Sequence, residues 1–225
     1  MCLRLVRHEL ALWACLLRRL TRRGPHGVGP GDTAAGYAAA QAGIMWVMLF
    51  VSVLETVVLA LIVPWPLVHA VLLVIGLWGI FFVAGHQAAC AVRPHVVGAD
   101  GSLRIRHGAL VDIRVPAEHI AAARVGTHWV GGGLLQIDDG PDGGTGDRTG
   151  DAAGERTDGR TDRDGGTAVL AVAGQVAVTV ELTAPVPFVR PLGRPARARV
   201  LRFWADDPRA LVAALHRSDT PDPRP

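Results

Sequence analysis

Two long apolar runs, separated by only three residues, constrain this sequence more than any other feature. The first covers residues 44–63 with one charged residue, Glu55, and the second covers residues 67–92 with no Lys, Arg, Asp or Glu. A helix needs about 20 residues to cross a bilayer, so each run is long enough. Because the Pro64-Trp65-Pro66 turn (64–66) cannot continue a helix, we predict a transmembrane helical hairpin. The alternative is a pair of buried core helices in a soluble protein, which two such runs in immediate succession disfavour.

The arginines predict how this hairpin is oriented. Four of them, Arg18, Arg19, Arg22 and Arg23, precede the first run, and Arg93 follows the second, whereas the turn carries none. Positively charged residues flanking membrane helices stay on the cytoplasmic side. We therefore expect a multi-pass protein of the plasma membrane with both termini in the cytoplasm.

Residues 1–23 have the pattern of a basic amphipathic helix. On a helical projection the leucines and Trp13 share one face, and most of the arginines lie on the other. This pattern predicts an interfacial helix on anionic lipid; the alternative is a helix that packs on the soluble domain through the same apolar face. Residues 24–43 begin with glycine and proline and are predicted to be a linker, with Tyr37 at the membrane interface.

After residue 93 the apolar residues alternate, which is typical of β-strands. We predict strands over 102–107, 110–116, 119–125, 127–137, 167–173, 176–182 and 198–205, with a loop rich in proline and arginine over 184–198. Asp206-Asp207-Pro208 is a helix start, with an Asp cap and proline at the first helical position. A helix is expected over 209–217, before a tail over 218–225.

Residues 138–166 interrupt the strand pattern with glycines, acidic residues and arginines, and contain no Val, Leu, Ile or aromatic residue. Such a segment cannot bury enough apolar surface to offset the entropy of ordering, so we predict a disordered acidic insertion. A calcium-binding loop is the alternative, but the acidic residues do not have EF-hand spacing.

The run GSLRIRHGALVDIRVPAEHIAAARV and the closing FWADDPRALVAALHR carry a resemblance to known proteins. Together they resemble the bacterial PH-like domains that follow transmembrane hairpins, and the whole chain looks like the uncharacterised integral membrane proteins of actinomycetes. The resemblance implies an α+β domain over residues 93–217: a small PH-like antiparallel β-barrel or sandwich closed by a C-terminal helix.

Two sets of residues are candidate contact sites. Four arginines near the end of the domain, Arg190, Arg194, Arg197 and Arg199, have the chemistry to bind lipid phosphates. Glu55 lies near mid-span, where a carboxylate is costly and needs a polar partner. Trp78 lies at a matching level of the second helix, and its indole N–H is the predicted intramembrane contact.

No sequence pattern indicates an enzyme. The chain has no G-x-S-x-G, H-E-x-x-H or C-x-x-C motif, and its three cysteines form no close pair. Cys90 is interpreted as a buried, inert thiol, and His107, His119 and His128 as ordinary strand residues. We therefore expect no catalytic residue, no cofactor, no metal and no nucleic-acid partner.

The expected function is that of a non-enzymatic membrane protein. Its PH-like domain would bind anionic lipid headgroups or a protein partner at the membrane surface. The alternatives are a small transporter or channel subunit that oligomerises through Glu55, and a purely structural assembly module.

Overall fold

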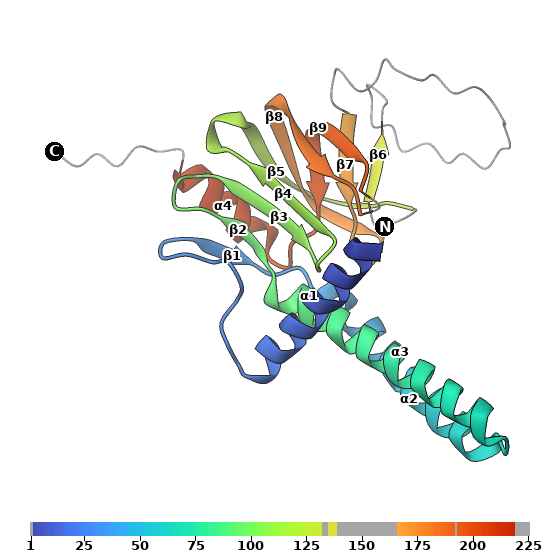
Figure 1. Cartoon of the computed structure of the whole chain (residues 1–225). Helices are drawn as coiled ribbons and strands as arrows, with labels where there is room; N and C mark the ends of the chain where they lie inside the picture. Colours follow the sequence, from blue (N-terminus) through green and yellow to red (C-terminus); the bar gives the residue numbers. More distant parts are fainter. Residues whose placement is uncertain (1, 132–134, 139–165, 192, 219–225) are drawn as a thin grey trace, which may run out of the picture.

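The computed structural model describes residues 2–131, 135–138, 166–191 and 193–218. Figure 1 shows a helical hairpin that projects from a pair of β-sheets, with a third helix across its base. The predicted acidic insertion lies outside the described residues, apart from Asp138 and Gly166, which belong to the strands on either side of it.

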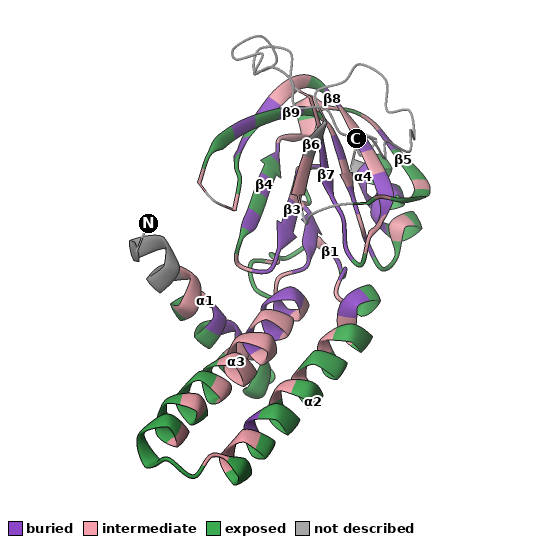
Figure 2. Ribbon diagram, turned by 90° about the vertical axis from the view of Figure 1, so that its right-hand side faces the viewer, coloured by how far each residue is buried: buried purple, intermediate pink, exposed green. Residues whose placement is uncertain are grey.

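The hairpin consists of α2 (Ala39–Ile62) and α3 (Pro66–Val92), which are both long and apolar enough to cross a membrane. Val63 to Trp65 join the two helices, and Pro66, which the sequence pattern places in the turn, is the first residue of α3. Large apolar side chains are exposed along α2 from Ile44 to Ile62, whereas α3 becomes buried from Gly85 onward (Figure 2). At 1.5 Å per residue the exposed part of α2 is roughly 28 Å long, close to the hydrocarbon thickness of a bilayer.

Thr56 and Gly76 form the close contact between α2 and α3. Thr56 is one of the two buried residues of α2, and its hydroxyl donates a hydrogen bond to the Ser52 carbonyl (2.7 Å). A Cβ atom built on Gly76 would lie 2.8 Å from Thr56 Cγ2, so only glycine fits at this position. A Cβ atom on Gly79 would meet nothing within 4 Å.

Two sheets lie beyond the base of the hairpin (Figure 1). In the first, four antiparallel strands follow chain order: β1 (Thr33–Ala35), β2 (His95–Val97), β3 (Leu103–His107) and β4 (Val111–Val115). A short 3-10 helix, Ala117–His119, leads into the second sheet. That sheet has the strand order β5 (Ile120–Trp129), β8 (Gln175–Val189), β9 (Pro195–Phe203), β7 (Gly166–Leu170) and β6 (Leu135–Asp138). Its β7–β9 pair is parallel and its other pairs are antiparallel.

The inner faces of both sheets and the helix α4 (Pro208–Ser218) share one hydrophobic core. The backbone N–H of Ala210 donates a hydrogen bond to the Asp207 carboxylate (2.9 Å), which confirms the predicted start of this helix. Neither sheet closes on itself. The structure therefore confirms the α+β class with a C-terminal helix, and it does not confirm the predicted barrel.

Two sequence predictions about element boundaries were wrong. The predicted linker over 24–43 contains β1 and the first turn of α2, because Thr33–Ala35 pairs with β2. The predicted loop over 184–198 is an extended hairpin instead, in which Val186 to Val189 pair with Pro195 to Ala198. Prolines are tolerated there because Pro187 and Pro195 are exposed.

The Thr56–Gly76 contact predicts that a larger side chain at Gly76 separates the two helices. Gly76→Leu should lower the stability of the hairpin by about 1–3 kcal/mol through overpacking. Gly79→Leu, where the space is open, should have little effect. Thermal unfolding of the full chain in detergent compares the two variants, and equal melting temperatures would contradict the predicted contact.

Candidate functional site at the junction of hairpin and sheets

Helix α1 (Cys2–Leu20) packs across the base of α3. Leu12 is fully buried, and a Cβ atom on Gly85 of α3 would lie 3.2 Å from Leu12 Cβ. Trp13 stacks on Phe81 with ring centroids 3.9 Å apart. Helix α1 therefore packs on the hairpin helix α3, whereas the predicted alternative to an interfacial helix was packing on the soluble domain.

Beside this contact, α1 carries an exposed apolar stripe that includes Trp13. Leu10, Trp13, Leu17 and Leu20 are 57–71% exposed and recur every three or four residues, so they line one helical face. We call these four residues the α1 stripe. The stripe belongs to a helix that touches α3 near residues 81–89, where α3 passes from exposed to buried.

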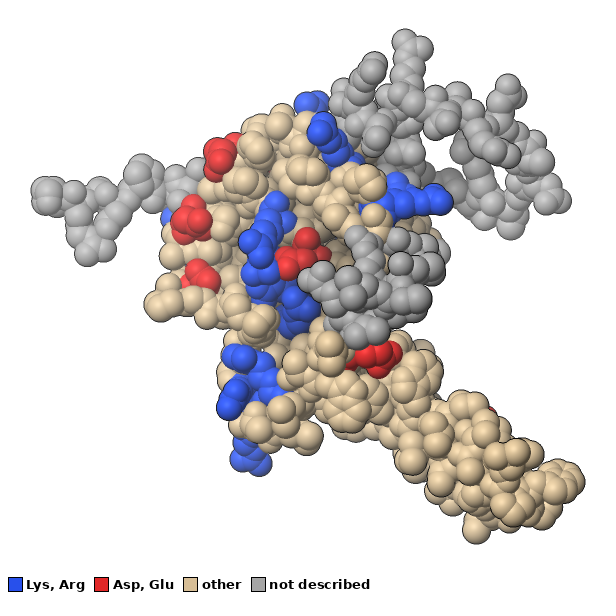
Figure 3. Space-filling view, viewed as in Figure 1, with Lys and Arg blue, Asp and Glu red and all other residues tan. Residues whose placement is uncertain are grey.

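Five arginines surround the base of the hairpin, and we call them the arginine collar: Arg18, Arg19, Arg22, Arg23 and Arg93. Figure 3 shows arginine side chains gathered at the lower end of α1, next to a hairpin surface that carries no blue on this face. Within the described part of the chain no acidic side chain pairs with a collar arginine. The collar is therefore an uncompensated positive surface.

A groove of about 510 Å³ lies within the collar. It is lined by Arg18, Arg23, Arg93 and His26, and one wall is the apolar and small side chains of α1. Burial and the positive charges of Arg93 and Arg18 lower the pKa of His26. This groove combines guanidinium groups with an apolar wall, a lining suited to an anionic amphiphile.

Arg106 fixes the loop that carries one side of this groove. It is a fully buried arginine on β3, and its guanidinium donates hydrogen bonds to the carbonyls of His26 (2.6 Å) and Gly27 (3.4 Å). Burial lowers the pKa of Arg106 to about 10, which leaves it charged at neutral pH. Gly27 has a φ of +68°, and its missing side chain makes room for the guanidinium.

Tyr37, predicted to lie at the membrane interface, is fully buried beneath the hairpin instead. Its ring stacks on His95 with centroids 4.7 Å apart, and its hydroxyl accepts a hydrogen bond from the Gly108 N–H (2.7 Å). Burial and the neighbouring Cys90 raise the pKa of Tyr37 well above its ordinary value. Tyr37 thus links the residues that precede α2 to the β3–β4 turn.

His95 joins three elements below the hairpin. Its Nδ1 accepts a hydrogen bond from the Arg106 backbone N–H (3.1 Å), and its Nε2 donates to the Trp204 carbonyl (2.9 Å). These partners require the neutral tautomer that carries its proton on Nε2. Burial lowers the pKa of His95 to about 3.

Three potential metal ligands converge at the same junction: His86 and Cys90 from α3, and His107 from the end of β3. Their ligand atoms all lie within 4.8 Å of one another. His86 Nε2 and Cys90 Sγ are 3.7 Å apart. Burial and the nearby His86 lower the pKa of His107 to about 4, so His107 is neutral, the form in which imidazole binds metals. We call these residues the histidine–cysteine cluster.

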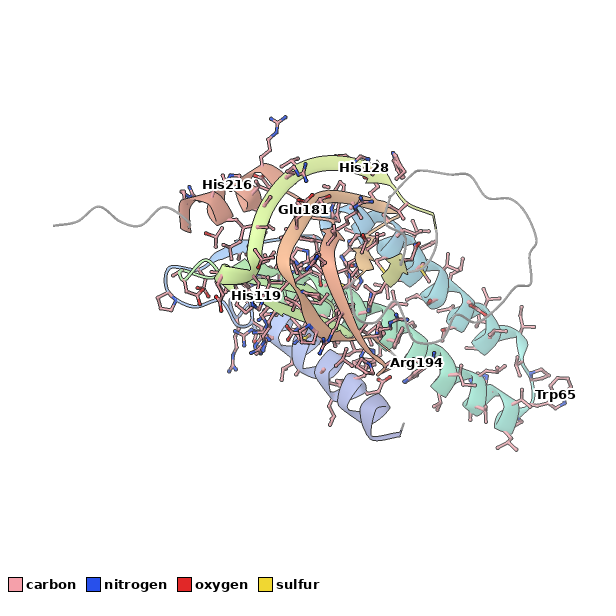
Figure 4. The ribbon with its side chains drawn as sticks, turned by 90° about the horizontal axis from the view of Figure 1, so that it is seen from above. Trp65, His119, His128, Glu181, Arg194 and His216 are labelled. Atoms are coloured by element: carbon pink, nitrogen blue, oxygen red, sulfur yellow. The ribbon has the colours of Figure 1, made fainter. Side chains whose placement is uncertain are left out.

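The four arginines predicted to contact lipid lie on the β8–β9 hairpin and not at the collar. Arg190 and Arg194 form its turn, with the Arg190 N–H donating to the Arg194 carbonyl (2.9 Å), while Arg197 and Arg199 point outward from β9. All four are exposed, and Figure 4 shows where Arg194 lies. The structure thus brings them together on one hairpin, where all four side chains are exposed.

The predicted contact between Glu55 and Trp78 is not present. Glu55 is exposed on α2, and Trp78 is exposed on α3, where it packs against Phe82 (5.7 Å between centroids). Residues 55–56 of α2 lie level with this part of α3, since Thr56 contacts Gly76. However, Thr56 and not Glu55 faces α3. Among the described residues no hydrogen bond or ion pair reaches Glu55.

Sequence reasoning missed the histidine–cysteine cluster and treated its members separately. One signal was present, because His86 and Cys90 are four residues apart and therefore share a helical face. His107 has no sequence signal of this kind. Only the folded arrangement of β3 beneath α3 brings it to the other two.

No family model matches the chain, and no curated protein or solved structure matches it either. The resemblance to PH-like membrane proteins therefore stays a prediction.

The neutral state of His95 predicts a loss of stability in acid. The unfolded state binds a proton near the ordinary pKa of 6.5, whereas the folded state resists protonation down to about 3. Stability is therefore complete above pH 6.5 and falls as the pH drops toward 3, by roughly 3–5 kcal/mol in all.

Melting temperatures of the full chain across this pH range test the prediction. His95→Gln should be less stable at neutral pH and should show a shallower decline in acid, while the exposed His128→Gln should behave as the wild type. Identical pH profiles for His95→Gln and wild type would contradict the assignment.

Proposed function

We propose that this chain is an integral membrane protein that holds a two-sheet domain against an anionic membrane surface and binds lipid headgroups through the arginine collar. The observation that carries this proposal is the groove lined by Arg18, Arg23 and Arg93 next to the base of an apolar hairpin. Guanidinium groups make paired hydrogen bonds to phosphate oxygens. An anionic lipid would place its phosphate in the groove and its chains along the hairpin.

The α1 stripe supports the same placement. Its four exposed apolar side chains lie on the helix that carries Arg18 and Arg19 of the collar, so one element offers both the apolar and the cationic parts of an interfacial helix. Anionic lipid attracts each surface arginine by about 1 kcal/mol. The collar and the stripe together would fix the height of the sheets above the bilayer.

The charge distribution also supports the proposed orientation. The collar and the sheets are at one end of the hairpin, and Trp65 is at the far end, as Figure 4 shows. Trp65 is exposed and suited to the opposite interface. By the positive-inside rule the sheets and both termini would be cytoplasmic.

The β8–β9 arginines offer a second cationic surface. The resemblance to PH-like domains supports a headgroup or protein-binding role for them, and all four are exposed without an acidic partner in the described part of the chain. The collar is favoured as the lipid site because its arginines line a groove and adjoin the hairpin. The proposal includes no catalytic step.

Substitution of the collar arginines tests the lipid site. In Arg18→Gln/Arg23→Gln/Arg93→Gln, three lost attractions of about 1 kcal/mol each should weaken binding of phosphatidylglycerol about 100-fold. Energy transfer from the tryptophans to a dansyl-labelled phosphatidylglycerol, titrated into the full chain in neutral detergent, measures this affinity. Binding should also weaken as salt is added.

A matched variant on the β8–β9 hairpin, Arg194→Gln/Arg197→Gln/Arg199→Gln, serves as the control and should retain most of the affinity. The same label on phosphatidylcholine controls for chain insertion. Equal affinity of the wild type for the two lipids, or a larger loss in the control variant than in the collar variant, would overturn the proposal.

Glu55 supports a second candidate function, assembly through the hairpin. It is exposed at mid-span with no partner among the residues described, and a carboxyl group facing hydrocarbon is costly. A second copy or another membrane protein would supply the missing partner. This is the oligomeric subunit considered above as the alternative.

Replacement of Glu55 by leucine should therefore reduce the assembly of the protein in membranes. Cross-linking of the full chain in native membranes measures assembly, with Glu118→Gln, which changes a carboxylate outside the hairpin, as the control. An unchanged cross-linking pattern in Glu55→Leu would remove this candidate.

A further inference from the structure

We propose that His86, Cys90 and His107 form a metal site that binds Zn²⁺ between the helical hairpin and the first sheet. This inference goes beyond the proposed lipid-binding function and does not depend on it. The three side chains come from two elements, α3 and β3, and their ligand atoms lie within 4.8 Å of one another.

The donor atoms suit zinc. Imidazole nitrogens and a cysteine sulfur are the common zinc ligands, and this set binds neither Mg²⁺ nor Ca²⁺ well. In a tetrahedral site, bonds of roughly 2.0 Å to nitrogen and 2.3 Å to sulfur place those two atoms about 3.5 Å apart. His86 Nε2 and Cys90 Sγ are 3.7 Å apart, a hydrogen-bonding distance that is also close to this spacing.

The backbone brings the third ligand close. Gly108, directly after His107, has a φ of +51°, and a Cβ atom there would lie 3.5 Å from His86 Cε1 and 3.7 Å from Cys90 Sγ. The β3–β4 turn therefore rests directly on the two helical ligands. A glycine permits both the left-handed conformation and this close approach.

A second layer of contacts holds the ligands in place. Tyr37 packs on His107 with centroids 5.3 Å apart, and its hydroxyl holds the Gly108 N–H. Supporting contacts of this kind orient metal ligands in known sites. Nδ1 of His107 is buried without a hydrogen-bond partner among the described residues, and buried polar atoms are rarely left so.

Three protein ligands leave one position of a four-coordinate zinc ion for a further group. Tyr37 and the buried Gln41 both interact with Cys90 and line this side of the site. Because the ligands belong to α3 and β3, the ion would fasten the hairpin to the first sheet. Zinc should therefore raise the melting temperature of the whole chain.

Cobalt substitution of the full chain in detergent tests the site, with chelator-treated protein as the starting material. Co²⁺ bound by a thiolate gives a sulfur-to-cobalt charge-transfer band, and one equivalent should saturate it. The band should disappear in Cys90→Ser and weaken in His86→Gln and His107→Gln. Added Zn²⁺ should displace the cobalt and raise the melting temperature of the wild type alone among these proteins.

Cys15→Ser and His128→Gln are the matched controls. Cys15 is buried in a separate cluster with Leu12 and Ala89, and His128 is exposed on β5. All variants carry Cys2→Ser, because the Cys2 side chain lies outside the described residues. Circular dichroism confirms that each variant is folded.

Persistence of the cobalt band in folded Cys90→Ser, or its equal loss in folded Cys15→Ser, would overturn the proposal. So would wild-type protein that binds no cobalt, or that takes up Cu⁺ but not zinc. Since lipid affinity is measured separately on the collar variants, failure of this test leaves the lipid proposal unaffected, and the reverse also holds.

Discussion

The pairing of β1 with β2 is the constraint on which the rest of the structure depends. Ala35 lies opposite His95 in this ladder, and between these two residues the chain leaves the sheet, forms the entire helical hairpin and returns. Only Gly36 to Ala38 separate β1 from α2, and only Arg93 and Pro94 separate α3 from β2. The hairpin is therefore an insertion between two neighbouring strands of one sheet, and its base is set by their hydrogen bonds.

The junction beneath this insertion is unusually rich in polar side chains for a buried region. Arg106, His95, His107 and Tyr37 are each at most 2% exposed, and each contacts an element other than its own. Burying polar groups is favourable only when they find partners. The terminal guanidinium nitrogens of Arg106 and both ring nitrogens of His95 have such partners, and these hydrogen bonds tie the 24–32 loop, β2, β3 and the end of β9 into one unit. The positions of the collar and of the histidine–cysteine cluster both follow from these contacts.

How far the sequence predicted this arrangement depends on the range of the interactions involved. The length of the two apolar runs, with Pro-Trp-Pro between them, predicted the hairpin, and the Asp207-Pro208 pair predicted the start of α4. Both signals are local. The three-residue strand β1 was missed, since it pairs with a strand that follows sixty residues later. The hairpin of β8 and β9 was predicted to be a loop because of its prolines. Proline is tolerated in this hairpin because Pro187 and Pro195 are at exposed positions.

The candidate sites also differ in how much of them the sequence could predict, according to whether they depend on local or on long-range contacts. The arginines before the hairpin were recognised from sequence as a group, but the groove that they form with Arg93 depends on how α1 crosses α3. Glu55 was assigned an inward position that Thr56 occupies, because a one-residue change on a helix turns a side chain by about 100°.

A domain held by one flexible linker can turn freely above the bilayer, whereas this one is attached by two adjacent strands. Because this double attachment prevents such rotation, the tilt of the hairpin in the proposed membrane placement would determine which face of the sheets is presented to other proteins in the membrane.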